Sequence, residues 1–178
     1  MVKQDTMRPV DLAVVLALAV ESDLTHATFS QIGETLGVSA STAFAAVKRL
    51  QVTGLLRPGS HEPNRRELLN FLEHGAKHAF PAVMGREVRG VPTAHSGPAL
   101  SGMIEDVAPV VWPDPEGTAR GTGIAPLYPN ATQLPERSPK LYAALTLVDA
   151  MRVGQARERN AARSALATGL GVKRADSY

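Results

Sequence analysis

The 178-residue chain contains no cysteine, few aromatic residues and no apolar run long enough to span a bilayer. The lack of cysteine excludes disulfides and cysteine-rich zinc sites, and it is compatible with a reducing cytoplasm. Aromatic residues make up only 4% of the chain, so a core must come mainly from alanine, leucine and valine, which suits closely packed helices. A membrane-spanning helix needs about 20 apolar residues. The composition therefore predicts a mainly α protein, which we expect to be cytoplasmic.

The first apolar run, at residues 12–20, has two interpretations. Together with Lys3 it imitates a short secretory signal peptide, but Asp5 and Asp11 argue against a signal. A buried first helix explains the same run, with Pro9 tolerated in its first turn. We therefore expect a buried helix that begins near residue 10.

Charge is nearly balanced over the whole chain, at +2, but it is unevenly distributed. Residues 48–90 carry eight Lys/Arg against four Asp/Glu, and residues 138–178 carry seven against three. Residues 1–47 and 91–137 each have a formal charge of −3. An anionic partner such as a phosphate backbone favours this asymmetry, although a solvated surface of mixed charge gives similar counts.

Proline and glycine divide the chain into three regions. Residues 81–139 hold ten of the thirteen prolines and seven of the fifteen glycines, which excludes long helices there. Residues 1–80 and 140–178 show helical periodicity instead. We expect three parts with these boundaries, the middle one being a connecting or regulatory segment.

The middle region contains two apolar clusters, Val107–Trp112 and Gly123–Tyr128, which predict short strands or ordered loop anchored on a core. Its large apolar side chains include Met103, Ile104, Trp112 and Tyr128. They either fill a small core, which we favour, or line an apolar pocket, or face a partner protein.

The last region opens with a helix start signal, in which Ser138 is the N-cap and Pro139 the first helical residue. Apolar residues then follow at helical spacing: Leu141, Ala144, Leu145, Val148 and Met151. Gly154 is expected to end or bend this helix, and residues 155–168 to form a second, charged helix.

Residues 28–56 predict two helices joined by a sharp turn. Thr28 and Gln31 form a capping box that begins the first helix. Its inward positions are Phe29, Ile32 and Leu36. Gly37 lies where the chain must reverse, and Ser39 is placed to cap the next helix at once. Two helices that meet at a steep angle are the expected result.

The second of these helices has two contrasting faces. Its inward residues are Ala43, Ala46, Val47 and Leu50, its outward residues are Ser41, Ala45, Lys48 and Val52, and Thr42 and Arg49 flank the outward face. Small side chains near the start of a helix let it approach the major groove closely, and cations near its end are placed for phosphates. An ordinary helical hairpin with two cations on its wet face is the alternative.

The run Thr-x-x-Gln-Ile-x-x-x-Leu-Gly-Val-Ser-x-Ser-Thr, followed by Val-Lys-Arg-Leu-x-x-x-Gly-Leu-Leu, resembles the helix-turn-helix of winged-helix bacterial repressors, particularly MarR-like ones. The resemblance covers roughly residues 10–60 and implies a DNA-binding winged helix. The residues we expect to contact DNA are Ser39, Ala40, Ser41, Thr42, Ala45, Lys48, Arg49, Arg57, Arg65 and Arg66.

The resemblance has local departures. Many such regulators carry a polar residue and an arginine where this chain has Phe44 and Ala45, which weakens direct readout; we expect Phe44 to pack inward. Residues 54–57 fit a first wing strand and residues 58–63 a turn, but no return strand follows. We therefore expect a short or truncated wing.

Asn64 and Glu67 suggest a further capping box after the wing, beginning a helix that ends at Gly75. Arg65 and Arg66 at its start either grip a phosphate together with exposed backbone N–H groups or are ordinary surface arginines.

The same resemblance implies a dimer, because a lone helix-turn-helix reads only a half-site. Helices that flank the DNA-binding unit form the MarR-like interface, so residues 140–178 are the expected dimerisation helices here. The alternative for their Leu/Ala/Val stripe is to fold back onto the N-terminal domain as core.

Other chemistry has weak support. His74 and His78 are four apart, but Gly75 intervenes and no third ligand stands at a suitable spacing. His95-Ser96-Gly97 lacks the glycine pattern of a nucleophile elbow, and residues 117–123 have glycines but no following Lys-Ser/Thr for a P-loop. We expect no metal, no cofactor and no enzymatic activity.

Two functions remain. The first is a cytoplasmic, DNA-binding transcriptional regulator, a homodimeric repressor that inserts residues 40–50 into the major groove of double-stranded DNA. The second is a protein-interaction module, such as an antitoxin-like or adaptor subunit, that uses a winged-helix scaffold. A small-molecule effector is compatible with the first and a protein partner with either.

Overall fold

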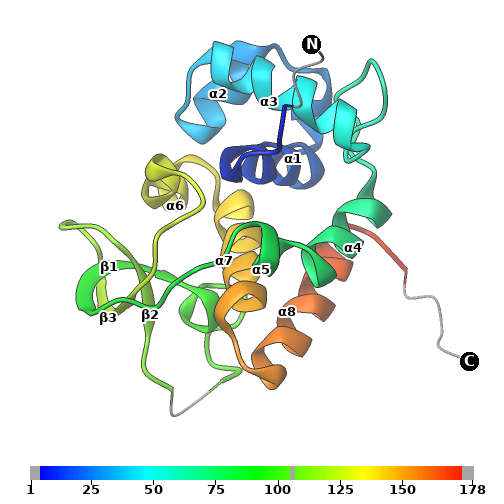
Figure 1. Ribbon diagram of the computed structural model, residues 1–178. Coiled ribbons are helices and arrows are strands. Elements are labelled where there is room, and N and C mark those ends of the chain that lie inside the picture. Colours follow the sequence, from blue (N-terminus) through cyan, green and yellow to red (C-terminus); the bar gives the residue numbers. More distant parts are fainter. Residues whose placement is uncertain (1–4, 105–106, 174–178) are drawn as a thin grey trace, which may run out of the picture.

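The computed structural model describes residues 5–104 and 107–173 (Figure 1). The N-terminal helices are α1 (Pro9–Val20), α2 (Phe29–Leu36), α3 (Ala40–Thr53), α4 (Arg65–His74) and α5 (Ala76–Ala79), with the 3₁₀ turn η1 (Ser22–His26) between α1 and α2. The middle holds β1 (Glu87–Thr93), η2 (Ala94–Ser96), β2 (Val110–Pro113), β3 (Ala119–Gly123), η3 (Pro129–Gln133) and α6 (Leu134–Arg137). The chain then forms α7 (Pro139–Val153) and α8 (Ala156–Gly169). The fold is mainly α, as predicted.

Helix α1 lies at the centre of the molecule. Every residue from Asp11 to Ala19 is buried, because α3 packs on one side of the helix and α7 on the other (Figure 1). A helix that is apolar all round is expected in such a position. The prediction of a buried first helix, with Pro9 in its first turn, is confirmed.

Local side-chain caps set the limits of α2 and α3. The Thr28 hydroxyl accepts from the Gln31 N–H, and the Gln31 side chain accepts from the Thr28 N–H at 2.8 Å, which completes the predicted capping box. Gly37 ends α2 with φ of 73°, a left-handed conformation that a residue without Cβ adopts at low cost. Ser39 then accepts from the Thr42 N–H at 3.1 Å and begins α3. The predicted helix-turn-helix is confirmed.

The wing is a minimal hairpin. Leu56 and Pro63 form a single antiparallel bridge, and the Arg57 N–H donates to the Glu62 carbonyl at 2.9 Å. The short wing predicted from the sequence is thus present. The predicted capping box at its end is wrong, because the Asn64 side chain makes no cap hydrogen bond although α4 does begin at Arg65.

The Pro/Gly-rich middle forms three short strands that each pair with the other two. β1 is antiparallel to β2 and β3, while β2 and β3 are parallel. Close backbone approach requires glycine here, since a Cβ at Gly90 would lie 2.0 Å from the Trp112 carbonyl oxygen. Of the predicted apolar clusters, Val107–Trp112 contributes β2, whereas Gly123–Tyr128 is mostly loop after β3.

The large residues of the middle region divide between core and surface. Trp112 and Tyr128 are buried, as the favoured core interpretation predicts, whereas Met103 is 62% exposed. The Tyr142 hydroxyl of α7 donates to the Pro92 carbonyl of β1 at 2.6 Å, and Trp112 packs edge-on against the Tyr142 ring. The small sheet therefore lies against α7 (Figure 1).

Helices α7 and α8 begin and end where the sequence predicts. Ser138 accepts from the Leu141 N–H at 3.2 Å, and α7 ends at Val153 with Gly154 as its C-cap. All α7 residues from Ala144 to Met151 are buried, and the helix packs against α1 and α8. The Leu/Ala/Val stripe of α7 therefore serves as core within one chain.

The segment before α7 contacts the turn between α2 and α3. The Asn130 side-chain amide donates to the Gly37 carbonyl, and the Arg137 guanidinium donates to the Glu34 carbonyl at 2.8 Å. The middle region is thus attached directly to the helix-turn-helix. Across residues 5–104 and 107–173, no helix has both the length and the apolarity to cross a bilayer.

Candidate nucleic-acid interface

The outward face of α3 is open in this structure. At about 100° per residue, five side chains fall within a sector of about 100°. They are Ser41, Phe44, Ala45, Lys48 and Val52. Of these, Ala45 is half-buried and the other four are exposed. Helices α2 and α3 lie at one end of the molecule (Figure 1), and the exposed side chains of the strip leave this face of α3 open to solvent.

Arg49 does not belong to this face, which corrects the prediction that it contacts phosphate. Its side chain is 5% exposed, and its Nε and one terminal nitrogen each lie 2.7 Å from a carboxylate oxygen of Asp11 in α1. The hydrogen bond to Asp11 raises the pKa of Arg49 against the opposing effect of burial. Asp11 also accepts from the Arg8 N–H at 2.8 Å. Arg49 therefore fixes α3 to α1 and is not exposed on the outward face of α3.

Phe44 faces outward, which corrects the expectation that it packs inward. Its ring is 47% exposed and meets the Phe29 ring edge-on, with ring centroids 5.2 Å apart. The Lys48 ammonium lies 5.6 Å from the Phe44 centroid, within the range of a cation–π contact. The outward face therefore combines an apolar body with one cation, where the sequence had suggested two cations and small residues.

The start of α3 carries small side chains, most of which are exposed. Ser39, Ala40 and Ser41 are exposed, while Thr42 is partly buried. The hydroxyls of Ser39 and Thr42 lie 2.9 Å apart, and both are involved in capping the helix. The exposed Ser41 hydroxyl, in contrast, takes no part in this capping.

The three arginines beyond α3 have different environments. Arg57 on the wing is 64% exposed and pairs with Glu62 at 3.2 Å, and Arg66 is exposed in the first turn of α4. Arg65, in contrast, donates to the Ala19 carbonyl at 2.7 Å and to the Leu170 carbonyl at 3.3 Å. A cation at the negative end of a helix is electrostatically favoured. Arg65 therefore links the ends of α1 and α8, and its contact with a phosphate stays a prediction.

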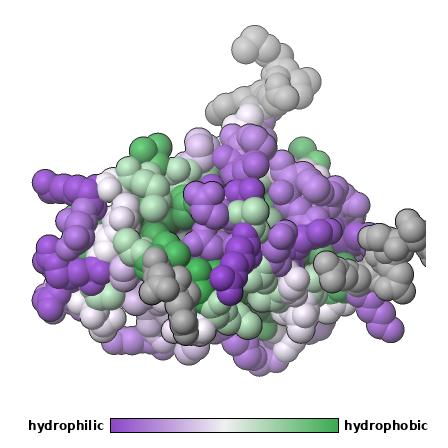
Figure 2. All heavy atoms as spheres, turned by 90° about the horizontal axis from the view of Figure 1, so that it is seen from below, coloured by the Kyte–Doolittle hydropathy of each residue, from purple (hydrophilic) through white to green (hydrophobic). Residues whose placement is uncertain are grey.

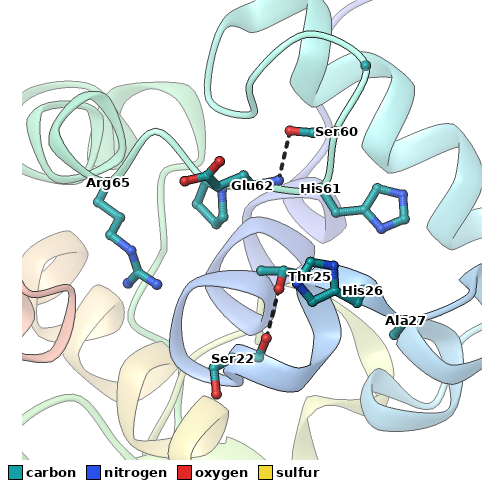
Figure 3. A pocket seen from close by; sticks show the side chains of 10 residues that line it. Ser22, Thr25, His26, Ala27, Ser60, His61, Glu62 and Arg65 are labelled. Carbon is teal, nitrogen blue, oxygen red and sulfur yellow. Dashed lines mark hydrogen bonds between the residues drawn. The ribbon is translucent and has the colours of Figure 1, made fainter.

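A pocket of about 620 Å³ lies beside this face, between η1 and the wing loop (Figure 3). Ser22, Thr25, His26 and Ala27 line one side, and Ser60, His61, Glu62 and Arg65 line the other. His61 also packs against the Phe29 ring, with centroids 5.2 Å apart, and burial lowers its pKa from 6.5. No sequence pattern indicated this arrangement, because it depends on how the wing loop folds over η1.

Polar groups between the sheet and α7 form a buried hydrogen-bond network around Asp149. The buried Asp149 accepts from the Thr93 hydroxyl at 2.7 Å, from the Trp112 indole at 2.6 Å and from Arg152 at 2.6 Å. Burial raises the pKa of Asp149, and Arg152 with the two other donors opposes that rise. This network fixes β1 and β2 to α7.

The residues of the weakly supported catalytic and phosphate-binding motifs make contacts within the fold. His95 is buried with Nδ1 3.4 Å from Glu158, while the Ser96 hydroxyl accepts from the Val110 N–H at 3.1 Å, so the two form no dyad. Gly121 and Gly123 lie in β3, and Gly117 lies just before it, where a Cβ would be 2.1 Å from the carbonyl carbon of Gly90. Within the described residues, no group of three potential metal ligands is found.

Residues 6–67 match the family model described as MarR family. The match spans α1 to the start of α4 and confirms the resemblance to MarR-like winged-helix regulators over about a third of the chain. It supports a DNA-binding transcription regulator, since the proteins of this family are regulators rather than enzymes. No curated protein and no solved structure matched the chain.

Proposed function

From a MarR-like winged helix at residues 6–67, we propose that the chain is a transcriptional repressor that binds its operator as a homodimer, with α3 in the major groove. The observation that carries this proposal is the open outward face of α3, in which small residues near the start are followed by Lys48. A recognition helix of a helix-turn-helix protein enters the groove with its N-terminal residues against the base edges. Repression follows if the operator overlaps its own promoter.

The predicted DNA contacts that this geometry supports fall into two groups. Ser39, Ala40, Ser41, Thr42 and Ala45 lie along the start of α3, and Lys48, Arg57 and Arg66 supply exposed or accessible cations. A duplex seated on α3 would meet the wing with Arg57, whose ion pair with Glu62 is exposed and exchangeable. Arg49 fixes α3 to α1 instead, and Arg65 links the ends of α1 and α8.

We retain the homodimer in the proposal because one recognition helix reads only one half-site, whereas the two helices of a dimer read two. The buried stripe of α7 is used within the chain, so we place the dimer contact on exposed surface of α8 or on the middle region. Light scattering at micromolar concentration, which gives the molar mass in solution, tests this point. A mass of one chain in both free and DNA-bound samples would contradict it. We further propose that the protein acts in the cytoplasm, where its operator would be.

A mobility shift with the DNA upstream of its own gene, at two salt concentrations, tests the function. Wild type should shift the fragment, and raising the salt should weaken binding because phosphate contacts release counterions. Lys48→Ala should weaken binding and reduce the salt slope by about one for each lost phosphate contact. Lys77→Ala is the matched control, since it removes an exposed lysine of α5 outside α3. Equal slopes for wild type and Lys48→Ala would contradict the placement of α3.

A protein-interaction module remains the second candidate, and exposed apolar residues of the middle region favour it. They are Val83, Met84, Met103 and Val107. Figure 2, which views the molecule from the end opposite α2 and α3, shows green apolar surface among the purple hydrophilic patches. Copurification with the product of a neighbouring gene at one-to-one ratio, together with no mobility shift, would favour this function over the first.

A further inference from the structure

Apart from Lys48, the outward face of α3 lacks the side chains that read guanine or adenine by paired hydrogen bonds. Specific readout in the major groove commonly uses Arg or Lys on guanine, and Asn or Gln on adenine. The nearby arginine, Arg49, is buried against Asp11, and Gln51 donates its amide to the Ser60 carbonyl at 2.9 Å. Lys48 is the single charged side chain among the five outward residues of α3. Sequence discrimination by α3 therefore has to come mainly from another kind of contact.

Phe44 is the largest group at the start of this face. It lies within the first half of α3, which is the half of a recognition helix that reaches base edges. Its neighbours on the same surface are Ala40, Ser41 and Ala45, which are all small. The phenyl ring is therefore the bulkiest apolar group on this part of the face.

The ring is also held in place before any partner binds. Phe29 packs against it edge-on at 5.2 Å, and Phe29 is itself backed by His61 of the wing loop at 5.2 Å. The Lys48 ammonium lies over the ring, 5.6 Å from its centroid. A rigid apolar group costs little conformational entropy on binding, since its freedom has already been lost in the free protein.

We propose that Phe44 determines operator specificity by packing against the C5-methyl group of thymine in the major groove. This inference rests on the proposed function and names the base that α3 reads. Thymine is the base that presents a methyl group there, and apolar side chains including phenylalanine recognise it. Lys48, adjacent to the ring, then neutralises the neighbouring phosphate.

The test begins with duplexes of about 30 base pairs enriched by the protein from a random pool, long enough for two half-sites one helical turn apart. Each thymine of the enriched duplex is then replaced in turn by deoxyuridine, which removes the methyl group and keeps the base pairing. At one position in each half-site, deoxyuridine should weaken binding by wild type by about fourfold for each methyl, the factor expected for one buried methyl-sized group.

Phe44→Ala should bind the thymine and deoxyuridine duplexes equally, while Phe44→Leu, which retains an apolar side chain, should keep part of the discrimination. Val83→Ala is the matched control because it removes an exposed apolar side chain that lies outside α3, and it should leave the thymine preference unchanged. The deoxyuridine series on wild type needs no variant, so it stands even if Phe44→Ala folds poorly.

The outcomes separate the inference from the function on which it rests. Enrichment of a specific duplex without loss at any deoxyuridine position overturns the role of Phe44 and leaves the DNA-binding function intact. Thymine discrimination that persists in Phe44→Ala also overturns it. Failure to enrich or shift any duplex at low salt overturns the proposed function, and the inference with it.

Discussion

Asp11 and Arg49 form a two-pronged ion pair that joins α1 to α3 with both side chains buried. Removing one partner of such a pair leaves a buried charge without compensation, which typically costs about 3–5 kcal/mol. Arg49→Ala is therefore expected to lower the free energy of unfolding in urea by about 3–5 kcal/mol. This loss of stability comes from the buried contact between α1 and α3, so it is expected in the absence of DNA.

Lys48→Ala, one residue away on the exposed side of the same helix, is the natural comparison. Surface substitutions usually change stability by about 0.5 kcal/mol or less, so this variant should unfold almost as wild type does. If Arg49→Ala and Lys48→Ala prove equally stable, the buried ion pair is not formed in solution.

His61 gives the wing loop a dependence on pH. Burial lowers its pKa below 6.5, so the folded protein favours neutral imidazole more than the unfolded chain does. The resulting contribution to stability is present above pH 6.5 and is lost as the pH falls through the lowered pKa of the folded state. Wild type should therefore lose stability relative to His61→Gln between neutral and mildly acidic pH. Chemical unfolding of both proteins at several pH values measures this difference, and a constant difference would contradict it.

At the scale of helices, the α2–α3 turn depends on the close approach of Gly33 to the chain after it. A Cβ at Gly33 would lie 2.5 Å from the Val38 carbonyl oxygen, and backbone cannot move aside as a flexible side chain would. Gly33→Ala should lower the melting temperature, although alanine favours a helix over glycine by about 0.5–1 kcal/mol. We expect the clash with the Val38 carbonyl to cost more free energy than the helix preference of alanine contributes.

Gly169→Ala supplies the matched control for that substitution. Gly169 is also helical, at the end of α8, and a Cβ added there would have no other atom within 4 Å, so alanine should be neutral or stabilising. Circular dichroism melts of the two variants compare a crowded with an open glycine. A melting temperature for Gly33→Ala at or above that of wild type would contradict the close approach.

The elements that could be predicted from the sequence are those whose limits are set locally. Thr28 with Gln31, Ser39, and Ser138 with Pro139 each act within three or four residues, and all begin helices as expected. The three strands could not be placed from pattern alone, because their pairing joins residues such as Gly90 and Pro113 that are distant in the sequence.

The candidate site was predictable in outline but not in its individual side chains. Helical periodicity placed Arg49 at the edge of the outward face, and only the approach of α1 with Asp11 shows that it is buried. For Phe44 the sequence suggested an inward position, but Phe29 and Lys48 hold it on the surface. In both cases a side chain of another helix, Asp11 of α1 or Phe29 of α2, determines where the residue points.

At the scale of the whole molecule, Trp112 reports on the contact between the sheet and α7. It is the single tryptophan of the chain, it is buried, and its indole donates to Asp149. If the three regions unfold as one cooperative unit, unfolding followed by tryptophan fluorescence and by far-ultraviolet circular dichroism should coincide. We expect one transition, because Asn130 and Arg137 also link the middle region to the helix-turn-helix. Separated midpoints would instead favour three independent domains.

Trp112→Phe should shift that transition downward, since it leaves Asp149 without one of its donors while retaining an aromatic ring. Circular dichroism measures this variant, which has lost its fluorescent probe. Unchanged stability would mean that Arg152 and Thr93 alone satisfy the carboxylate.

The central position of α1 also limits how this chain can be divided. Its one flank is covered by α3 and its other by α7, which the chain supplies more than a hundred residues later, and Arg65 joins the ends of α1 and α8. A fragment cut after the wing would expose the apolar flank of α1 to water. We therefore expect the helix-turn-helix of this protein to need α7 and α8 for its stability, so that a fusion carrying the N-terminal helices alone would not keep their packing.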